Sequence, residues 1–221
     1  MTIGDKRMKK IIIIDGGPRR NMNTAQMAAS FAEGVCSAGK DIDIKQYRLY
    51  DIDYRGCMSC LGCKLKGKSS QVCVFKDGLK EVLDKVSQAD GLAIASPIYM
   101  GRNTAQTQAF LERLVFPWLS YNDFSLSAMK KMPVVFIYTM NATEELLPMA
   151  LPQLEFTENL VAKCLGSVER VIAFNTTQVK DYSRYEMAAA SQGKAEYRAE
   201  HWEKDLQSAF EAGKRMAEKI D

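Results

Sequence analysis

The sequence has very little histidine, no long hydrophobic run and no strong excess of charge of either sign. Its single histidine, His201, excludes metal sites built on two histidines. Because His201 falls in a charged helical pattern, Ser-His-Asp and Cys-His catalysis also lack support. The 30 lysines and arginines against 27 acidic residues give a net charge of +3 without basic clusters, which argues against nucleic-acid binding.

The first apolar run, residues 11–14, is too short to cross a bilayer or to form the core of a signal peptide. We therefore expect a cytoplasmic protein that does not associate with membranes. A length of 221 residues with 47% hydrophobic content is enough for one full core. The prediction is a single domain over residues 1–221.

Short apolar runs alternate with helical patterns along the chain. The isoleucines at 11–14 are typical of a strand buried on both faces of a parallel sheet. Further strands are expected at 42–47, 92–95, 134–138 and 168–174, and helical patterns occupy 25–35, 79–86, 104–116, a segment ending at 165, and 185–220. Five β-α units predict an α/β fold with a doubly wound parallel sheet, in which ligands bind at the carboxyl ends of the strands.

A polar loop, residues 16–24 with the sequence GGPRRNMNT, follows the first strand and leads into a helix. It offers arginine, asparagine and threonine side chains together with the free N–H groups of a helix N-terminus, and these groups suit a phosphate dianion. The alternative is an ordinary capped helix, in which Asn23 or Thr24 is the N-cap and the arginines are solvated.

The loop after the third strand, residues 95–104, has the sequence ASPIYMGRNT. Pro97 restricts the backbone, Tyr99 supplies a flat face, Gly101 allows close approach, and Thr104 can cap the next helix. These features suit a planar ring. The alternative is a tight turn with Tyr99 packed on the sheet edge.

Together the two loops resemble those of the flavodoxin-like NADPH-dependent FMN reductase family, particularly its iron-sulfur flavoprotein branch. The resemblance covers about residues 9–140 and implies a five-stranded sheet in the order 2-1-3-4-5. It also implies FMN as cofactor and NAD(P)H as co-substrate, with electrons passed to a quinone, a flavin, or another small molecule or redox protein. Relatives are often homodimers or homotetramers. The residues implied to bind FMN are Gly17, Arg19, Asn21, Asn23, Thr24, Pro97, Ile98, Tyr99, Met100, Gly101, Thr139 and Asn141.

Four of the six cysteines, Cys57, Cys60, Cys63 and Cys73, lie in an irregular, lysine-rich stretch at residues 56–75, which we call the cysteine stretch. Four thiolates could ligate a [4Fe-4S] cluster, as in the iron-sulfur flavoproteins, or tetrahedral zinc. They could equally be free, redox-responsive thiols. Three lysines of the stretch would raise the potential of a nearby cluster or attract an anionic partner; they are Lys64, Lys66 and Lys68.

Three functional hypotheses follow. The first is an enzyme, an FMN-dependent oxidoreductase that takes electrons from NAD(P)H; the flavin would carry the chemistry, and no catalytic acid or base can be named. The second is a non-enzymatic electron-transfer protein that holds FMN and an iron-sulfur cluster. The third is a flavin-free binding module whose cysteine stretch holds zinc. The aromatic segment at 114–121 is either a subunit contact or part of the core.

Overall fold

The computed structural model describes residues 7–67 and 71–220, and it is built on one central sheet. The five long strands are parallel and lie in the order β2 (Ile42–Arg48), β1 (Lys9–Asp15), β3 (Gly91–Tyr99), β5 (Val134–Thr139) and β6 (Val168–Ala173). The predicted fold and the predicted order of the parallel strands are confirmed. A two-residue strand, β4 (Arg102–Asn103), pairs antiparallel with the end of β3 and is an addition to the prediction.

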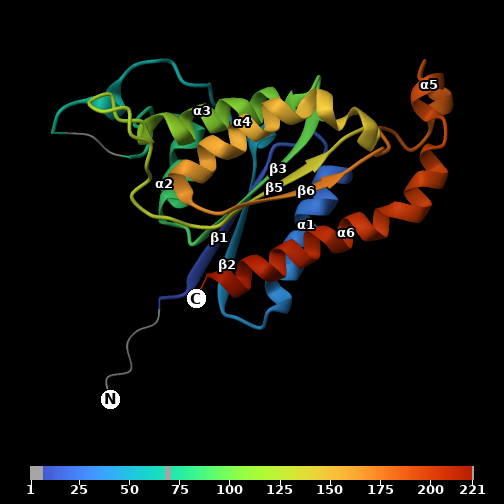
Figure 1. Ribbon diagram of the computed structural model, residues 1–221, viewed down its shortest axis with the longest axis horizontal. Helices are drawn as coiled ribbons and strands as arrows, with labels where there is room; N and C mark the ends of the chain where they lie inside the picture. The colour runs from blue at the N-terminus through green and yellow to red at the C-terminus, as the bar shows by residue number, and fades with distance from the viewer. Residues whose placement is uncertain (1–6, 68–70, 221) are drawn as a thin grey trace.

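Helices cover both faces of the sheet, as Figure 1 shows. Helices α1 (Asn23–Ser37) and α6 (Lys194–Lys219) lie on one face, and α2 (Gly78–Gln88), α3 (Ala105–Val115) and α4 (Leu147–Leu165) lie on the other. Successive side chains of a strand point to opposite faces. Ile11 and Ile13 therefore pack against α1 and α6, whereas Ile12 and Ile14 pack against the other three helices. This double burial explains the unbroken isoleucine run.

Two glycines let α1 and α6 pack with their backbones in contact. A Cβ atom on Gly34 would lie 1.9 Å from the carbonyl oxygen of Phe210, and one on Gly213 would lie 2.0 Å from that of Phe31. Any larger residue at either position would force the helices apart. Helix α6 is thereby held close along α1, with its N-terminal half beside the start of that helix.

The C-terminal segment differs from the single helix expected over 185–220. Helix α6 begins only at Lys194, after the short helix α5 (Ala188–Ser191). Gly193, which separates the two helices, has a left-handed backbone with a φ of 65°, and glycine adopts this conformation without steric cost. No helix in the described part of the chain is long and apolar enough to cross a membrane.

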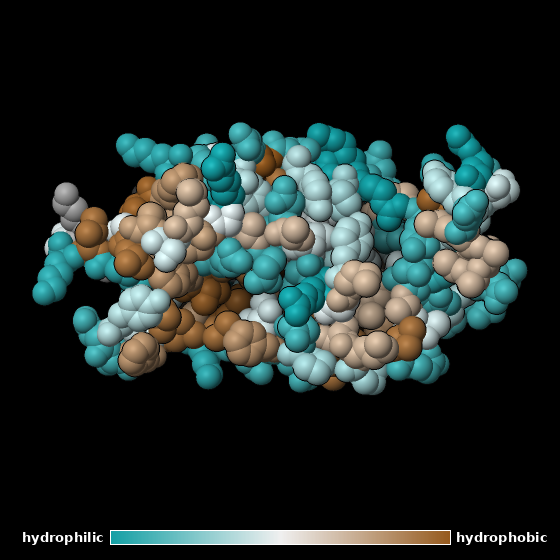
Figure 2. All heavy atoms as spheres, turned by 90° about the horizontal axis from the view of Figure 1, so that it is seen from above, coloured by the Kyte–Doolittle hydropathy of each residue, from teal (hydrophilic) through white to brown (hydrophobic). Residues whose placement is uncertain are grey.

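The aromatic segment at 114–121 is divided between the core and the surface. Trp118 is buried, whereas Tyr121 is 54% exposed. An apolar groove of about 360 Å³ runs beside it, between α3 and α4, and includes the exposed Phe156. Figure 2 looks onto α3 and α4 and shows hydrophobic side chains gathered toward the end of the molecule that carries the cysteine stretch. A subunit contact at this surface remains a prediction.

Candidate functional site

A cleft of about 640 Å³ lies at the carboxyl ends of β1, β3 and β5, where the strand order reverses. Four segments line it: the loop after β1, the end of β3 with its turn, and the segments after β5 and β6. Asn21 alone of the predicted FMN-binding residues lies outside, in a neighbouring cavity. The structure brings the other eleven together: Gly17, Arg19, Asn23, Thr24, Pro97, Ile98, Tyr99, Met100, Gly101, Thr139 and Asn141.

A buried carboxylate holds the start of the first loop. Asp15, the last residue of β1, is fully buried and accepts hydrogen bonds from Gly17 N at 2.8 Å and from Arg48 Nε at 3.2 Å. Burial raises the pKa of Asp15, while the Gly17 N–H and Arg48 act in the opposite direction. Sequence analysis missed both charged residues, although an acidic residue directly after a buried isoleucine run was a visible signal.

The N-terminus of α1 opens onto the cleft without a side-chain cap. Met22 occupies the N-cap position, and the first backbone hydrogen bond runs from Gln26 N to the Met22 carbonyl. The preceding N–H groups, from Asn23 to Ala25, therefore have no carbonyl partner within the helix. The alternative in which Asn23 or Thr24 caps the helix is wrong. This end of α1 offers backbone donors to an anion.

The side chains of Asn23 and Thr24 instead tie the first loop to distant segments. Asn23 donates from Nδ2 to the Thr177 carbonyl at 2.7 Å and accepts at Oδ1 from Arg198 at 2.9 Å. The Thr24 and Thr139 hydroxyls are hydrogen-bonded at 2.8 Å. These contacts fix the position of the helix end relative to β5 and to the C-terminal part of the chain.

The two arginines of the first loop point to different places. Arg19 lines the cleft and donates to the Gln178 carbonyl, whereas Arg20 pairs with Asp51 at 2.7 Å. Burial raises the pKa of Tyr99, and the charge of Arg19, which lines the same cleft, acts in the opposite direction. Arg19 is thus the cationic side chain that this loop presents to the cleft.

The segment after β3 forms a hairpin turn at the rim of the cleft. Strand β3 extends through Pro97 to Tyr99, further than the expected 92–95, and reverses at Met100 and Gly101 into β4. Both turn residues have positive φ, 51° and 78°, as two-residue hairpin turns require. Pro97 is tolerated because β1 pairs with β3 only as far as Ala95, so the missing N–H leaves no partner unsatisfied. Met100 is 99% exposed.

A buried hydroxyl network joins this turn to the first loop. Thr104 caps α3 by accepting from Thr107 N at 3.2 Å, as predicted, and donates to the Gly16 carbonyl at 2.9 Å. A Cβ atom on Gly16 would lie 1.8 Å from Thr107 Oγ1, so only glycine fits there. The loops after β1 and β3 are therefore held as one unit.

The segment after β6 forms a wall of the cleft that sequence analysis missed. Thr176, Thr177 and Gln178 line the cleft, and Asn141 donates to the Thr176 carbonyl at 3.2 Å. The signal was the polar run that follows strand β6, because carboxyl ends of parallel strands meet at the same edge.

The four cysteines of the cysteine stretch line one small pocket beside α3. Cys57 and Cys60 are exposed, Cys73 is half-buried, and Cys63 is buried, which raises the pKa of its thiol. Within residues 7–67 and 71–220, no three or more cysteine, histidine or acidic side chains lie close enough together to hold a metal ion. As placed, the thiols therefore share a pocket without forming a ligand set.

Lys64 holds the cysteine stretch to the rest of the protein. Its ammonium donates to the Phe116 carbonyl at 2.7 Å and to those of Pro117 and Leu119, and lies 4.8 Å from the centre of the Phe116 ring. These contacts fix the position of the ammonium, and the expectation that Lys64 attracts an anionic partner stays a prediction. Lys66 is exposed, and Lys68 lies outside the described residues.

Arg113 is a second support that sequence analysis missed. Its side chain is 1% exposed, pairs with Asp77, and donates to the carbonyls of Arg55 and Phe75, both at 3.1 Å. Hydrogen bonds from Arg113 and from backbone N–H groups lower the pKa of Asp77 against the opposing effect of burial. A single arginine within the hydrophobic pattern of α3 gave no signal of this role.

Comparison with known proteins places the chain in a family. Residues 9–174 match the sequence profile of the NADPH-dependent FMN reductase family, which is 166 of the 221 residues. The chain is 32% identical over 104 residues to an iron-sulfur flavoprotein of Methanocaldococcus jannaschii, covering 47% of this chain and 51% of that protein. It is 29% identical over 117 residues to one of Methanosarcina thermophila, covering 53% and 57%. The chain thus spans about half the length of the curated relatives it matches.

Solved structures share the fold at low sequence identity. An NAD(P)H:quinone oxidoreductase from Methanothermobacter marburgensis superimposes with a TM-score of 0.68 at 16% identity, covering 94% of this chain and 98% of that one. An FMN-dependent NADH-azoreductase from Bacillus anthracis, solved with FMN, gives 0.63 at 13% identity, covering 96% and 99%. Since the profile match spans both loops of the cleft, the family indicated by the resemblance is confirmed: this chain belongs to the NADPH-dependent FMN reductase family.

Proposed function

We propose that this chain is an FMN-binding oxidoreductase that takes electrons from NAD(P)H and passes them to a small-molecule acceptor or a redox protein. The observation that carries the proposal is the cleft at the β1 and β3 ends, in which two loops far apart in sequence meet. Relatives named iron-sulfur flavoproteins, quinone oxidoreductases and azoreductases support the same class of chemistry.

The residues present fit FMN. A Cβ atom on Gly17 would lie 3.0 Å from Asp15 Oδ1 and 3.2 Å from Thr24 Cβ, so glycine keeps the first loop tight around the helix end. The uncapped N–H groups of α1 and the Arg19 guanidinium are donors suited to a phosphate dianion. Tyr99 supplies an aromatic face at the rim, 45% exposed and held by a hairpin turn.

In this proposal the bound flavin supplies the hydride and electron chemistry, and the protein binds and orients it. The first loop would hold the phosphate, and residues 97–101 would lie along the ring. Asn141 and the segment at 176–178 would form a further wall of the FMN site. The hydroxyl network around Thr104 joins the first loop to the segment after β3 and so holds the two loops in place before FMN binds.

An absorption spectrum tests the proposal. Protein purified without oxygen should show two resolved flavin bands at one FMN per chain, and it should oxidise NADH or NADPH in the presence of a quinone or free flavin. A colourless protein that takes up no added FMN would contradict the proposal. The third hypothesis, a zinc-binding module, would then gain support from one equivalent of zinc.

The second hypothesis, an electron-transfer protein with an iron-sulfur cluster, is favoured by one observation: all four cysteines of the cysteine stretch line a single pocket. That pocket encloses only about 20 Å³, little more than one water molecule needs. The stretch as placed does not fit a cluster, so we derive no electron path through one. Iron and sulfide assays distinguish the cases: about four irons per chain, absent in Cys60→Ser while flavin remains, would support the second hypothesis.

A further inference from the structure

A second cavity lies behind the cleft and has a different character. It encloses about 630 Å³ and shares Met22, Asn23 and Thr177 with the cleft as a common wall. Its other side is formed by α6 and by the segment around Tyr182. Helix α6 lies beyond the residues that match the family profile, so the resemblance gives this cavity no role.

Two cations of α6 line this cavity one helical turn apart. Lys194 is only 5% exposed, and its ammonium donates to the Asn141 carbonyl. The Arg198 guanidinium lies 4.1 Å from the Trp202 ring centre and donates to Asn23 Oδ1 at 2.9 Å and to Gln26 Oε1 at 3.3 Å. Both side chains keep N–H donors beyond these contacts, since an ammonium has three and a guanidinium five.

Neither cation has an acidic partner. In the described part of the chain, no carboxylate lies within salt-bridge distance of Lys194 or Arg198, whereas the buried Arg113 pairs with Asp77 and Arg170 with Glu158. Burial lowers the pKa of Lys194 with no charge acting against it. Burial also lowers the pKa of Arg198, and the charges of Asp205 and Glu203 act in the opposite direction. A buried cation such as Lys194 is costly unless an anion joins it.

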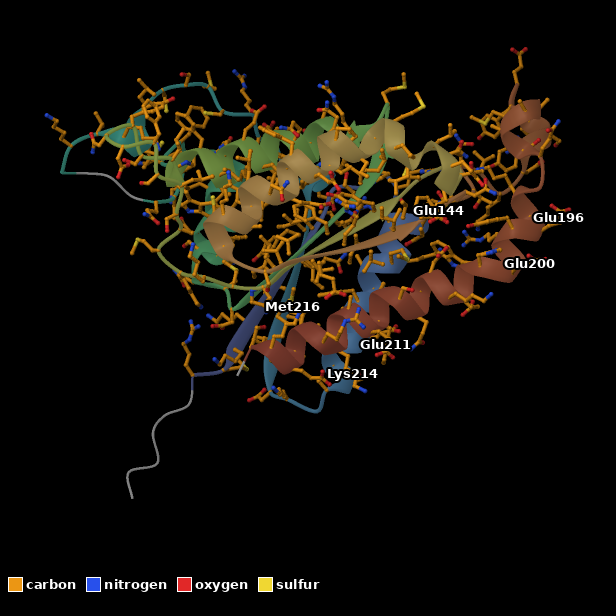
Figure 3. All side chains as sticks on the ribbon, viewed as in Figure 1. Glu144, Glu196, Glu200, Glu211, Lys214 and Met216 are labelled. Atoms are coloured by element: carbon orange, nitrogen blue, oxygen red, sulfur yellow. The ribbon has the colours of Figure 1, made fainter. Side chains whose placement is uncertain are left out.

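Two acidic residues on the first turns of α6, Glu196 and Glu200, do not line the cavity. Lys194, Arg198 and Trp202 are spaced four residues apart and share one face of α6. Glu196 and Glu200 are offset by two residues and are exposed; Figure 3 shows Glu196 projecting away from the sheet. The lining residues include three cations, Lys180 being the third, and one carboxylate, Glu203. The cavity is therefore net positive.

We propose that this cavity is a binding site for a phosphate monoester, with Lys194 and Arg198 as its charge partners. Such a group brings two negative charges and three acceptor oxygens, which matches two donors with spare N–H groups. The phosphate could belong to a nucleotide, whose remainder the 630 Å³ cavity has room for, or be free phosphate. The cavity and the cleft share one wall, so FMN content is measured beside phosphate binding to keep this proposal apart from the proposed function.

The experiment is titration calorimetry on the purified full-length protein, with FMN content measured on the same sample. The probes are inorganic phosphate, adenosine 2′,5′-bisphosphate and, as the uncharged comparison, adenosine. At least one phosphorylated probe should bind at one site per chain and adenosine should not. Tighter binding of the bisphosphate identifies a nucleotide as the source, and equal affinities identify free phosphate. No saturable binding of either would overturn the proposal.

Variants locate the binding. Lys194→Met and Arg198→Gln should each weaken phosphate binding by about ten- to hundredfold, the effect expected for one charge-assisted contact. Lys180→Gln changes an exposed residue of the lining and should weaken phosphate binding less. It keeps the proposal testable if the variants at Lys194 and Arg198 do not fold. Lys214→Gln is the matched control, because Lys214 is exposed on the distal half of α6 (Figure 3). Equal affinity in all four variants would overturn the proposal, as would a loss of FMN with phosphate binding unchanged.

Discussion

Two pairs of cations, one at α3 and β6 and the other on α6, are held in opposite ways. On the face covered by α2, α3 and α4, Arg113 is paired with Asp77 and Arg170 with Glu158. On the other face, Lys194 and Arg198 of α6 contact carbonyl and amide oxygens and have no carboxylate partner among the described residues. Removing one partner of a buried pair leaves the other charge uncompensated, whereas a buried cation without a partner is a cost that a ligand can offset. The comparison separates structural charges from candidate binding charges.

The largest effect is expected at Arg113. Arg113→Met would leave the Asp77 carboxylate and two backbone carbonyls without their partner, so we expect a loss of about 3–5 kcal/mol in the free energy of unfolding. Urea unfolding measures it. The cysteine stretch should also loosen, which would appear as faster reaction of Cys63 and Cys73 with a thiol reagent. A loss below about 1 kcal/mol would mean that the pair is not structural.

Next in size is the effect of the first loop on FMN affinity. Arg19→Ala combined with Asn23→Ala removes the cation that faces the cleft and the amide that fixes the helix end. We expect FMN binding to weaken by about 1.5–3 kcal/mol, the range for a hydrogen bond to a charged group. Calorimetric titration of FMN-free protein measures it.

Arg20→Ala is the control for this loop, because Arg20 pairs with Asp51 on the surface and does not line the cleft. Its FMN affinity should equal that of the unmodified protein. If Arg20→Ala weakens binding as much as the double variant, the loop acts through net charge, and the assignment of Arg19 is wrong.

The loops that line this cleft were largely predictable from sequence, but the distant residues that hold those loops in place were not. The isoleucine run and the two polar loops follow local rules of strand burial and helix starts, and the family resemblance implied the set of residues of which eleven line the cleft. The partners Arg48, Thr177 and Arg198 lie up to 175 residues away from the loop that they hold. Such contacts depend on tertiary packing, which no local pattern encodes.

Two predictions made from local sequence were wrong. Asn23 is a good N-cap residue, yet its side chain bonds to Thr177 and Arg198, because the helix end faces a cleft rather than solvent. The helical pattern over 185–220 continued through Gly193, whose left-handed backbone divides it. Both errors mark places where the C-terminal segment meets the first loop.

A smaller effect on stability is expected at Lys194, and it tests the contrast between paired and unpaired cations directly. Lys194→Met removes a buried cation with no carboxylate partner and leaves one carbonyl, that of Asn141, without its donor. The two changes oppose each other, so we expect the free energy of unfolding to change by less than about 1 kcal/mol. Urea unfolding of Lys194→Met and Arg113→Met under the same conditions measures the two losses side by side. A loss as large as that of Arg113→Met would show that the unpaired Lys194 does not differ from the paired Arg113.

The smallest effect concerns Asp205 on α6. Burial raises the pKa of Asp205 from 3.8 to about 6, and the nearby His201 and Arg198 act in the opposite direction without forming an ion pair. A carboxyl whose pKa is higher in the folded state favours folding when protonated, so this contribution is present below pH 3.8 and is lost as the pH rises through about 6. The stability of Asp205→Asn relative to the unmodified protein should therefore increase as the pH rises from 4 to 7. The midpoints of urea unfolding of both proteins at pH 4 and at pH 7 measure it. If the variant instead loses stability relative to the unmodified protein as the pH rises, Asp205 is the counter-ion of Arg198, and Arg198 does not belong with Lys194 as an unpaired cation.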